Sequence, residues 1–160
     1  MASLSEMLNE TEKSNLIASS IKIGSVYRMK LTPAEGVVPK NRNDTSRNKY
    51  FVVIGFDKEG NAIGFVLINT NIHPQLTEGV KRLHYPIFYK NYPFLGNTNR
   101  FVDCNKIKRI TTEKFNQLFS PNSEVGHLNE EDLMYIINTL KESPTITTKE
   151  LIKYGIIPKR

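Results

Sequence analysis

Two apolar segments in the middle of the chain constrain its fold most strongly. Residues 50–56 and 62–68 are rich in β-branched and aromatic residues and contain no charged ones. Such nearly continuous apolar runs are typical of central strands that are buried on both faces. The five residues between them, Asp-Lys-Glu-Gly-Asn, have the composition of a hairpin turn. The sequence therefore predicts a β-hairpin at the centre of a sheet, and a length of 160 residues suits one domain built around it.

The segments that flank this hairpin have shorter patterns. Residues 26–31 alternate in the manner of a strand with one exposed face, whereas residues 38–48 have no apolar period and are predicted to form a basic surface loop. Two further short strands are expected at residues 101–104 and 107–110. Helices are expected at residues 112–119, after the cap Asn129, and between the Thr147 capping box and Gly155. Helical spacing also occurs within residues 3–20.

Charge and cysteine content narrow the setting in which the chain works. Lys and Arg number 22 against 16 Asp and Glu, and the net charge of +6 attracts polyanions at long range. Cys104 is the single cysteine, so no internal disulfide is expected and a reducing compartment fits best. The N-terminal residues lack the pattern of a signal peptide, and the apolar runs are too short to span a bilayer. We therefore expect a cytoplasmic protein.

The order of these elements and several short segments resemble the MazF/PemK family of toxin endoribonucleases. The similar segments are residues 24–27, 31–36, 49–54, 66–70, 107–110 and 128–133. The resemblance covers roughly residues 22–142 and implies a mainly β, α+β domain, a small SH3-like barrel of the Kid/CcdB type with C-terminal amphipathic helices. Residues 1–21 would then be an N-terminal helical extension, and residues 143–160 a C-terminal helical extension.

The family resemblance also implies a reaction and a set of catalytic residues. Members cleave single-stranded RNA without a metal, as the ribose 2′-hydroxyl attacks the adjacent phosphodiester and leaves a cyclic phosphate and a 5′-hydroxyl. The catalytic arginine at the start of the second strand corresponds to Lys49, and the catalytic threonine or serine after the third strand corresponds to Thr70. Arg47 lies on the same side of an extended chain as Lys49 and can supply a guanidinium. The arginine and aspartate that a later strand contributes correspond to Asp103 and Asn105.

Contacts to RNA are expected from the basic loop and from the ends of the strands. The predicted RNA-binding residues are Lys40, Arg42, Asn69, Asn71 and Asn105. The resemblance further implies a homodimer, an antitoxin protein as partner, and no cofactor. The three histidines show no metal-ligand spacing, although His73 and His84 follow the third strand closely enough to act in proton transfer.

Other interpretations of the same residues stay open at this point. Arg47 and Lys49 also fit charged residues that flank a buried strand, and Thr70 fits the polar end of one. The aromatic residues between 85 and 94 suit base stacking, but also core or dimer contacts. The alternative function is a non-catalytic module on the same fold that binds nucleic acid or a partner protein.

Overall fold

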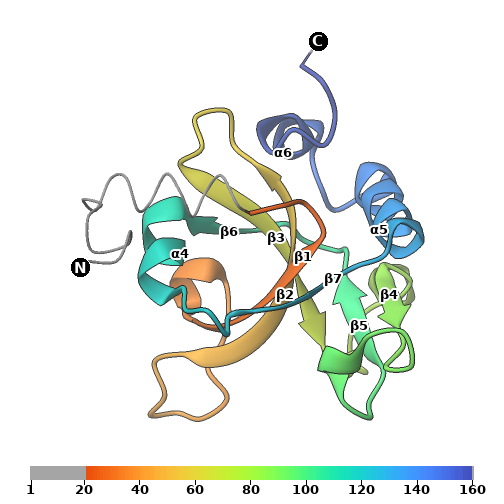
Figure 1. Ribbon diagram of the computed structural model, residues 1–160. Helices are drawn as coiled ribbons and strands as arrows, with labels where there is room; N and C mark the ends of the chain where they lie inside the picture. Colours follow the sequence, from red (N-terminus) through yellow and green to blue (C-terminus); the bar gives the residue numbers. More distant parts are fainter. Residues whose placement is uncertain (1–20, 160) are drawn as a thin grey trace, which may run out of the picture.

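The computed structural model describes residues 21–159 and has an α+β fold, built on a seven-stranded antiparallel sheet with helices toward the C-terminus (Figure 1). The strands are β1 (Ser25–Leu31), β2 (Arg47–Phe56), β3 (Ala62–Asn69), β4 (His84–Ile87), β5 (Arg100–Asp103), β6 (Lys108–Thr111) and β7 (Glu124–His127). The predicted α+β class is therefore confirmed. The N-terminal helical extension, residues 1–21, lies outside the described residues except for Ile21.

The predicted hairpin is β2 and β3, and it forms the middle of the sheet. The hydrogen-bonded order is β4-β5-β3-β2-β1-β7, and β6 also pairs with β3. On the edge of β3 that faces away from β2, residues 62–65 pair with β6, whereas Ile68 and Asn69 pair with β5. One long strand thus connects two short ones at its opposite ends, which places the end of β3 beside β5.

The sheet is not closed into a barrel, which corrects the small SH3-like barrel of the Kid/CcdB type that the resemblance implies. Strands β4 and β7 end the hydrogen-bonded path and do not pair with each other. Phe94 of the short helix η2 (Pro93–Leu95) packs against β7 instead: a methyl group on Gly126 of β7 would lie 2.7 Å from its ring. Pro86 also gives β4 a position without an N–H, which suits an edge strand.

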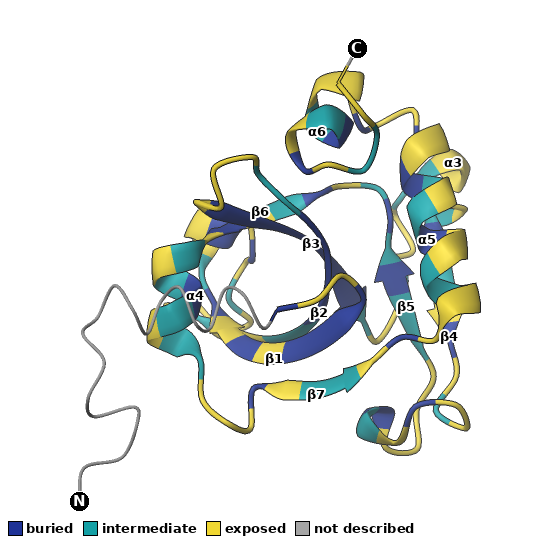
Figure 2. Ribbon diagram, turned by 45° about the horizontal axis from the view of Figure 1, so that its top comes forward, coloured by how far each residue is buried: buried dark blue, intermediate teal, exposed yellow. Residues whose placement is uncertain are grey.

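The two faces of the hairpin explain why its sequence is apolar throughout. Phe51 and Val53 belong to one cluster of buried side chains, and Val52 and Ile54 belong to another on the opposite face. Helix α4 (Thr112–Leu118) covers the first cluster with Phe115. Helices α5 (Glu130–Glu142) and α6 (Thr148–Lys153) cover the second, and Figure 2 shows the buried strands enclosed between these helices. Burial on both faces holds the two strands in a fixed register.

The predicted helix starts are present, and each begins at a side-chain cap. The hydroxyl of Thr111, the amide oxygen of Asn129 and the hydroxyl of Thr147 each accept a hydrogen bond from a backbone N–H in the first turn. Residues 21–159 also contain the short helices η1 (Pro33–Glu35) and α3 (Glu78–Lys81). Among the described residues, no helix is long and apolar enough to cross a membrane.

Residues 143–159 pack directly on the hairpin. Tyr154, which follows α6, lies over Gly55 and Gly64, and its carbonyl accepts a hydrogen bond from the N–H of Phe56 at 3.2 Å. A methyl group on Gly55 would lie 2.1 Å from that carbonyl oxygen. The two glycines therefore permit a close approach that no other residue type allows.

Candidate functional site

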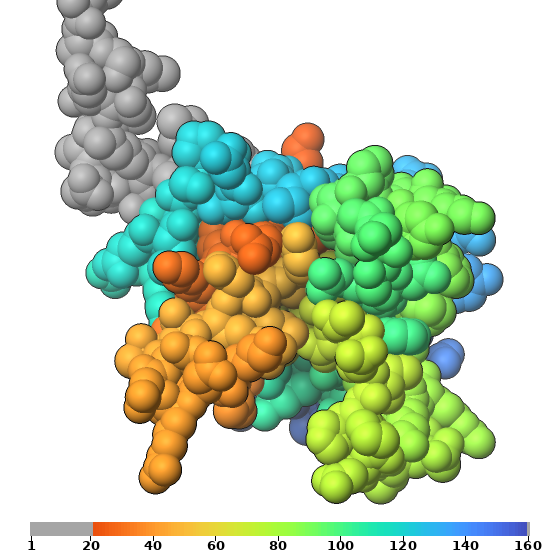
Figure 3. All heavy atoms as spheres, turned by 90° about the horizontal axis from the view of Figure 1, so that it is seen from below, coloured from red at the N-terminus to blue at the C-terminus, as the bar shows by residue number. Residues whose placement is uncertain are grey.

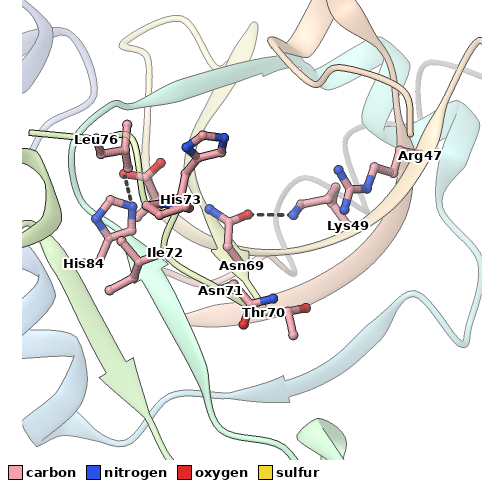
Figure 4. Close-up of a pocket in the computed structure, with 11 residues that line it drawn as sticks. Arg47, Lys49, Asn69, Thr70, Asn71, Ile72, His73, Leu76 and His84 are labelled. Atoms are coloured by element: carbon pink, nitrogen blue, oxygen red, sulfur yellow. Dashed lines mark hydrogen bonds and ion pairs between the residues drawn. The ribbon is translucent and has the colours of Figure 1, made fainter. Parts of the chain in front are cut away.

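Polar side chains gather at the end of the hairpin that lies opposite its turn. Because β2 and β3 are antiparallel, with Tyr50 opposite Ile68, the first residues of β2 meet the last residues of β3 there. The Nζ of Lys49 donates a hydrogen bond to Oδ1 of Asn69 at 2.6 Å (Figure 4). Lys49 and Asn69 are twenty residues apart in sequence, and the pairing of β2 with β3 brings their side chains together.

Two hollows open at this end of the hairpin. The larger has a volume of about 470 Å³ and the smaller about 180 Å³. Arg47, Lys49 and Thr70 line both of them, so these residues form the boundary between the two spaces. Figure 3 shows the surface hollowed between the orange segment that leads into β2 and the yellow-green segment that follows β3. The three residues predicted to be catalytic are therefore brought to one concave site.

The larger hollow also contains two of the predicted RNA-binding residues. Asn69 and Asn71 line it, together with the apolar residues Ile72, Pro74 and Leu76. The other three predicted residues lie elsewhere. Lys40 and Arg42 are exposed on the loop before β2 and line neither hollow, and Asn105 lies in the turn after β5, where its carbonyl accepts a hydrogen bond from Thr145.

The smaller hollow is strongly cationic. Arg28, Arg47, Lys49 and Arg100 line it, and no carboxylate is among the lining residues. The guanidinium carbons of Arg28 and Arg100 lie 5.6 and 5.0 Å from the centre of the Tyr50 ring, within range of cation–π attraction. Each of these two guanidinium groups thus has an aromatic partner in the wall of the hollow. An anion placed between them would be attracted by every charged group around it.

Arg28 and Arg100 are site residues that were not predicted from the sequence. Arg100 contacts a predicted site residue directly. Its Nη1 donates a hydrogen bond to Oγ1 of Thr70 at 3.0 Å, and its Nε is buried without a hydrogen-bond partner among the described residues. The family resemblance placed the arginine of the later strand at Asp103, at the far end of β5 from Arg100. The sequence did contain a signal for Arg100. It is a cation directly before the predicted strand at residues 101–104, as Lys49 is a cation at the start of the second predicted strand.

Lys49 has an unusual proton affinity for a lysine. Burial is the largest of the effects that lower the pKa of Lys49 from 10.5 to about 8; the charges of Arg47 and Arg100 contribute to the same fall, and Asp103 opposes it. At pH 7 a pKa near 8 leaves roughly one Lys49 side chain in ten neutral. An ordinary lysine would be neutral in only roughly one molecule in three thousand. Lys49 can therefore act both as a cation and as a proton acceptor.

An imidazole and a carboxylate face each other in the wall of the larger hollow. Nδ1 of His84 lies 2.9 Å from the carbonyl oxygen of Val80, so this nitrogen carries the hydrogen. Nε2 of His84 lies 3.7 Å from Oδ1 of Asp103, which also accepts a hydrogen bond from the N–H of Asn105 at 2.9 Å. His73 lies at the same hollow, where its Nδ1 accepts a hydrogen bond from the N–H of Gln75 (Figure 4).

The aromatic residues between β4 and η2 line neither of the two hollows. The hydroxyl groups of Tyr85 and Tyr92 both donate hydrogen bonds to the carboxylate of Asp132, which joins helix α5 to the sheet. Phe94 packs against Tyr50 and against Gly126. Phe94 therefore contacts a residue of the smaller hollow, whereas Tyr85 and Tyr92 serve the packing of α5 on the sheet.

Within residues 21–159 we find neither a reactive cysteine nor a cluster of metal-binding side chains. Burial raises the pKa of the Cys104 thiol to about 12, which keeps it protonated at neutral pH. In the same part of the chain, no three His, Cys, Asp or Glu side chains gather in a group that could hold a metal ion. Comparison with models of known protein families and with curated proteins finds no match for this chain.

Proposed function

We propose that this protein is a metal-independent endoribonuclease of toxin type that cleaves single-stranded RNA. The observation that carries the proposal is the meeting of three side chains at one concave site: Lys49 with a lowered pKa, and Thr70 hydrogen-bonded to Arg100. Cleavage by the 2′-hydroxyl requires a proton acceptor and fixed positive donors around the phosphate. Both are found within the two hollows.

In the proposed reaction the scissile phosphate lies at the boundary between the hollows. The neutral form of Lys49 takes the proton of the ribose 2′-hydroxyl, whose oxygen then forms a bond to phosphorus. Arg100 and Arg47 stabilise the negative charge on the phosphoryl oxygens. Because Arg100 donates to Oγ1 of Thr70, the hydroxyl hydrogen of Thr70 is available to a phosphoryl oxygen. The bond to the 5′-oxygen breaks, and this oxygen takes a proton from water in the open cleft; the hydroxide left behind takes the proton from the Lys49 ammonium and restores the neutral amine.

A relation to the MazF/PemK family belongs to the same proposal, with the barrel left open between β4 and β7. The position of Lys49 at the start of β2 and of Thr70 directly after β3 supports it. Lysine lacks the planar fork of the family's arginine. Arg100 supplies that fork from β5, and its hydrogen bond to Thr70 sets its orientation. The proposal includes action in the cytoplasm, a homodimer, and an antitoxin that covers the cleft.

The decisive experiment is incubation of the purified full-length protein with single-stranded RNA in excess chelator. We expect products that end in a 2′,3′-cyclic phosphate and begin with a 5′-hydroxyl. Lys49→Ala, Thr70→Ala and Arg100→Ala should each lower the rate by about a hundred-fold or more, because each removes a group that acts on the reacting phosphate. Lys58→Ala is the matched control, since it removes one exposed cation at the hairpin turn.

The outcomes separate the proposal from its rivals. The nuclease proposal is wrong if RNA stays intact with the wild-type protein. It is also wrong if the Lys49, Thr70 and Arg100 variants cleave RNA as fast as Lys58→Ala. The second candidate is a module that binds RNA without cutting it, and the cationic smaller hollow favours it. In that case RNA binding should weaken steeply with salt. The slope of log K against log [salt] should fall in magnitude by about one when Arg28 or Arg100 is replaced by alanine.

A further inference from the structure

We infer that the larger hollow binds one nucleobase that carries an exocyclic amino group, and that Asp103 selects this base over uracil. The inference rests on the proposed function, because it takes the larger hollow to be the place where RNA next to the scissile phosphate lies. It adds a specificity-determining residue that neither the reaction nor the charge of the cleft requires.

The larger hollow has the size and the walls of a pocket for one base. Its volume of about 470 Å³ falls within the range of small-ligand sites. Ile72, Pro74 and Leu76 give it an apolar wall against which a flat ring can pack, whereas the smaller hollow is lined mainly by polar and charged groups. Proteins that read single-stranded RNA commonly bind unstacked bases in this way. The phosphate and the base therefore have separate sites on either side of Lys49.

The carboxylate of Asp103 is a hydrogen-bond acceptor in the wall of this pocket. Nε2 of His84, whose Nδ1 donates to the carbonyl oxygen of Val80, lies 3.7 Å from Oδ1 of Asp103. Among the described residues, Oδ2 of Asp103 receives no hydrogen bond, and the side chain of Asp103 is 20% exposed. The N–H of Asn105 holds Oδ1 in place at 2.9 Å. The carboxylate is therefore positioned and has acceptor capacity left.

An exocyclic amino group matches this arrangement because it has two hydrogens and no acceptor. Cytosine, adenine and guanine each carry one, and acidic side chains accept hydrogen bonds from such groups. Uracil presents a carbonyl oxygen where cytosine presents its amino group, and this oxygen would face the carboxylate of Asp103, which can only accept hydrogen bonds. Leaving buried polar groups unpaired in this way discriminates strongly between similar ligands.

The test measures binding of the four ribonucleoside monophosphates to the full-length protein by NMR titration. All four carry the same phosphate, so the cationic hollow contributes equally to each. We expect UMP to bind about ten-fold more weakly than CMP. Asp103→Asn should reduce this difference to below about two-fold, because an amide can present either its oxygen or its NH₂ to the base. Asp57→Asn, the same change in the distant hairpin turn, should keep the wild-type preference.

A second measurement uses random-sequence RNA and determines the bases that flank each cleavage site. Wild-type protein should cut sites depleted of uracil at one fixed position, and Asp103→Asn should lose that depletion. If UMP binds the wild-type protein as tightly as CMP, or none of the four binds, the inference is overturned, whether or not RNA is cleaved. If CMP is preferred but RNA stays intact, the base pocket stands and the nuclease proposal falls.

Discussion

Replacing Lys49 by methionine should make the protein more stable at neutral pH. Lys49 is partly buried, and Arg47 and Arg100 lie close enough to oppose its charge. Methionine has nearly the same length but needs no hydration, so it fills the same space at the end of the hairpin. The hydrogen bond from Lys49 to Asn69 is lost, and water can replace it because Asn69 is not fully buried.

The size of the effect follows from the pKa. A fall from 10.5 to about 8 corresponds to about 3 kcal/mol of unfavourable free energy in the charged form, before solvent screening. Since Lys49 is only partly buried, screening reduces this to about 1–2 kcal/mol. Below pH 8 Lys49 is charged in both the folded and the unfolded state, so the whole free-energy penalty of the buried charge is present. Between pH 8 and 10.5 the unfolded chain binds more protons, so wild-type stability gains on the variant as pH rises.

Urea denaturation of both proteins at pH 6.5 and at pH 9.5 measures this difference in the free energy of unfolding. Lys49→Met should be more stable by about 1–2 kcal/mol at pH 6.5, and the gain should fall by about half at pH 9.5. Lys58→Met, at an exposed position, should show no such pH dependence. A Lys49→Met protein that is less stable at pH 6.5, or equally favoured at both pH values, would refute the reasoning.

Two further predictions concern stability. Gly55→Ala places a methyl group 2.1 Å from the carbonyl oxygen of Tyr154 and should destabilise the protein by more than about 2 kcal/mol in urea, whereas Gly79→Ala, with no neighbour within 4 Å, should change little. Lys114→Ala removes the partner of the buried Glu35 carboxylate, which it contacts at 2.7 Å, and should destabilise by about 2 kcal/mol. The same change made in a Glu35→Gln protein should have a smaller effect, and equal effects would show that the ion pair contributes nothing.

The central part of the fold was predictable because short stretches of sequence indicate it: the apolar runs of the hairpin and the capping residues of the helices. Residues 50–56 and 62–68 are apolar at every second position on both faces, and only a hairpin buried on both sides places all of them inside. The caps Thr111, Asn129 and Thr147 bond to backbone groups within their own first turn, so three or four residues of sequence contain the whole interaction.

The parts that were missed depend on contacts between distant segments. Strand β7 has a mixed sequence and pairs with β1 over only a few residues, interrupted by a register shift, so no period in residues 124–127 indicates it. The prediction of a barrel was wrong for a similar reason. β4 and β7 stay unpaired and Phe94 of η2 packs against Gly126 of β7, and no local pattern in either segment indicates this arrangement.

In the candidate site, too, some residues meet through local pairing and others through pairing of distant segments. Lys49 and Asn69 belong to the hairpin, so pairing of its two strands brings them together without any other element. Arg100 joins them only because β5 pairs with the end of β3, thirty residues after Thr70. That long-range pairing adds the second guanidinium that lowers the pKa of Lys49 and orients Thr70. β5 thus adds the charge of Arg100 to the effects of burial and of Arg47, and together they give a lysine that can accept a proton near neutral pH.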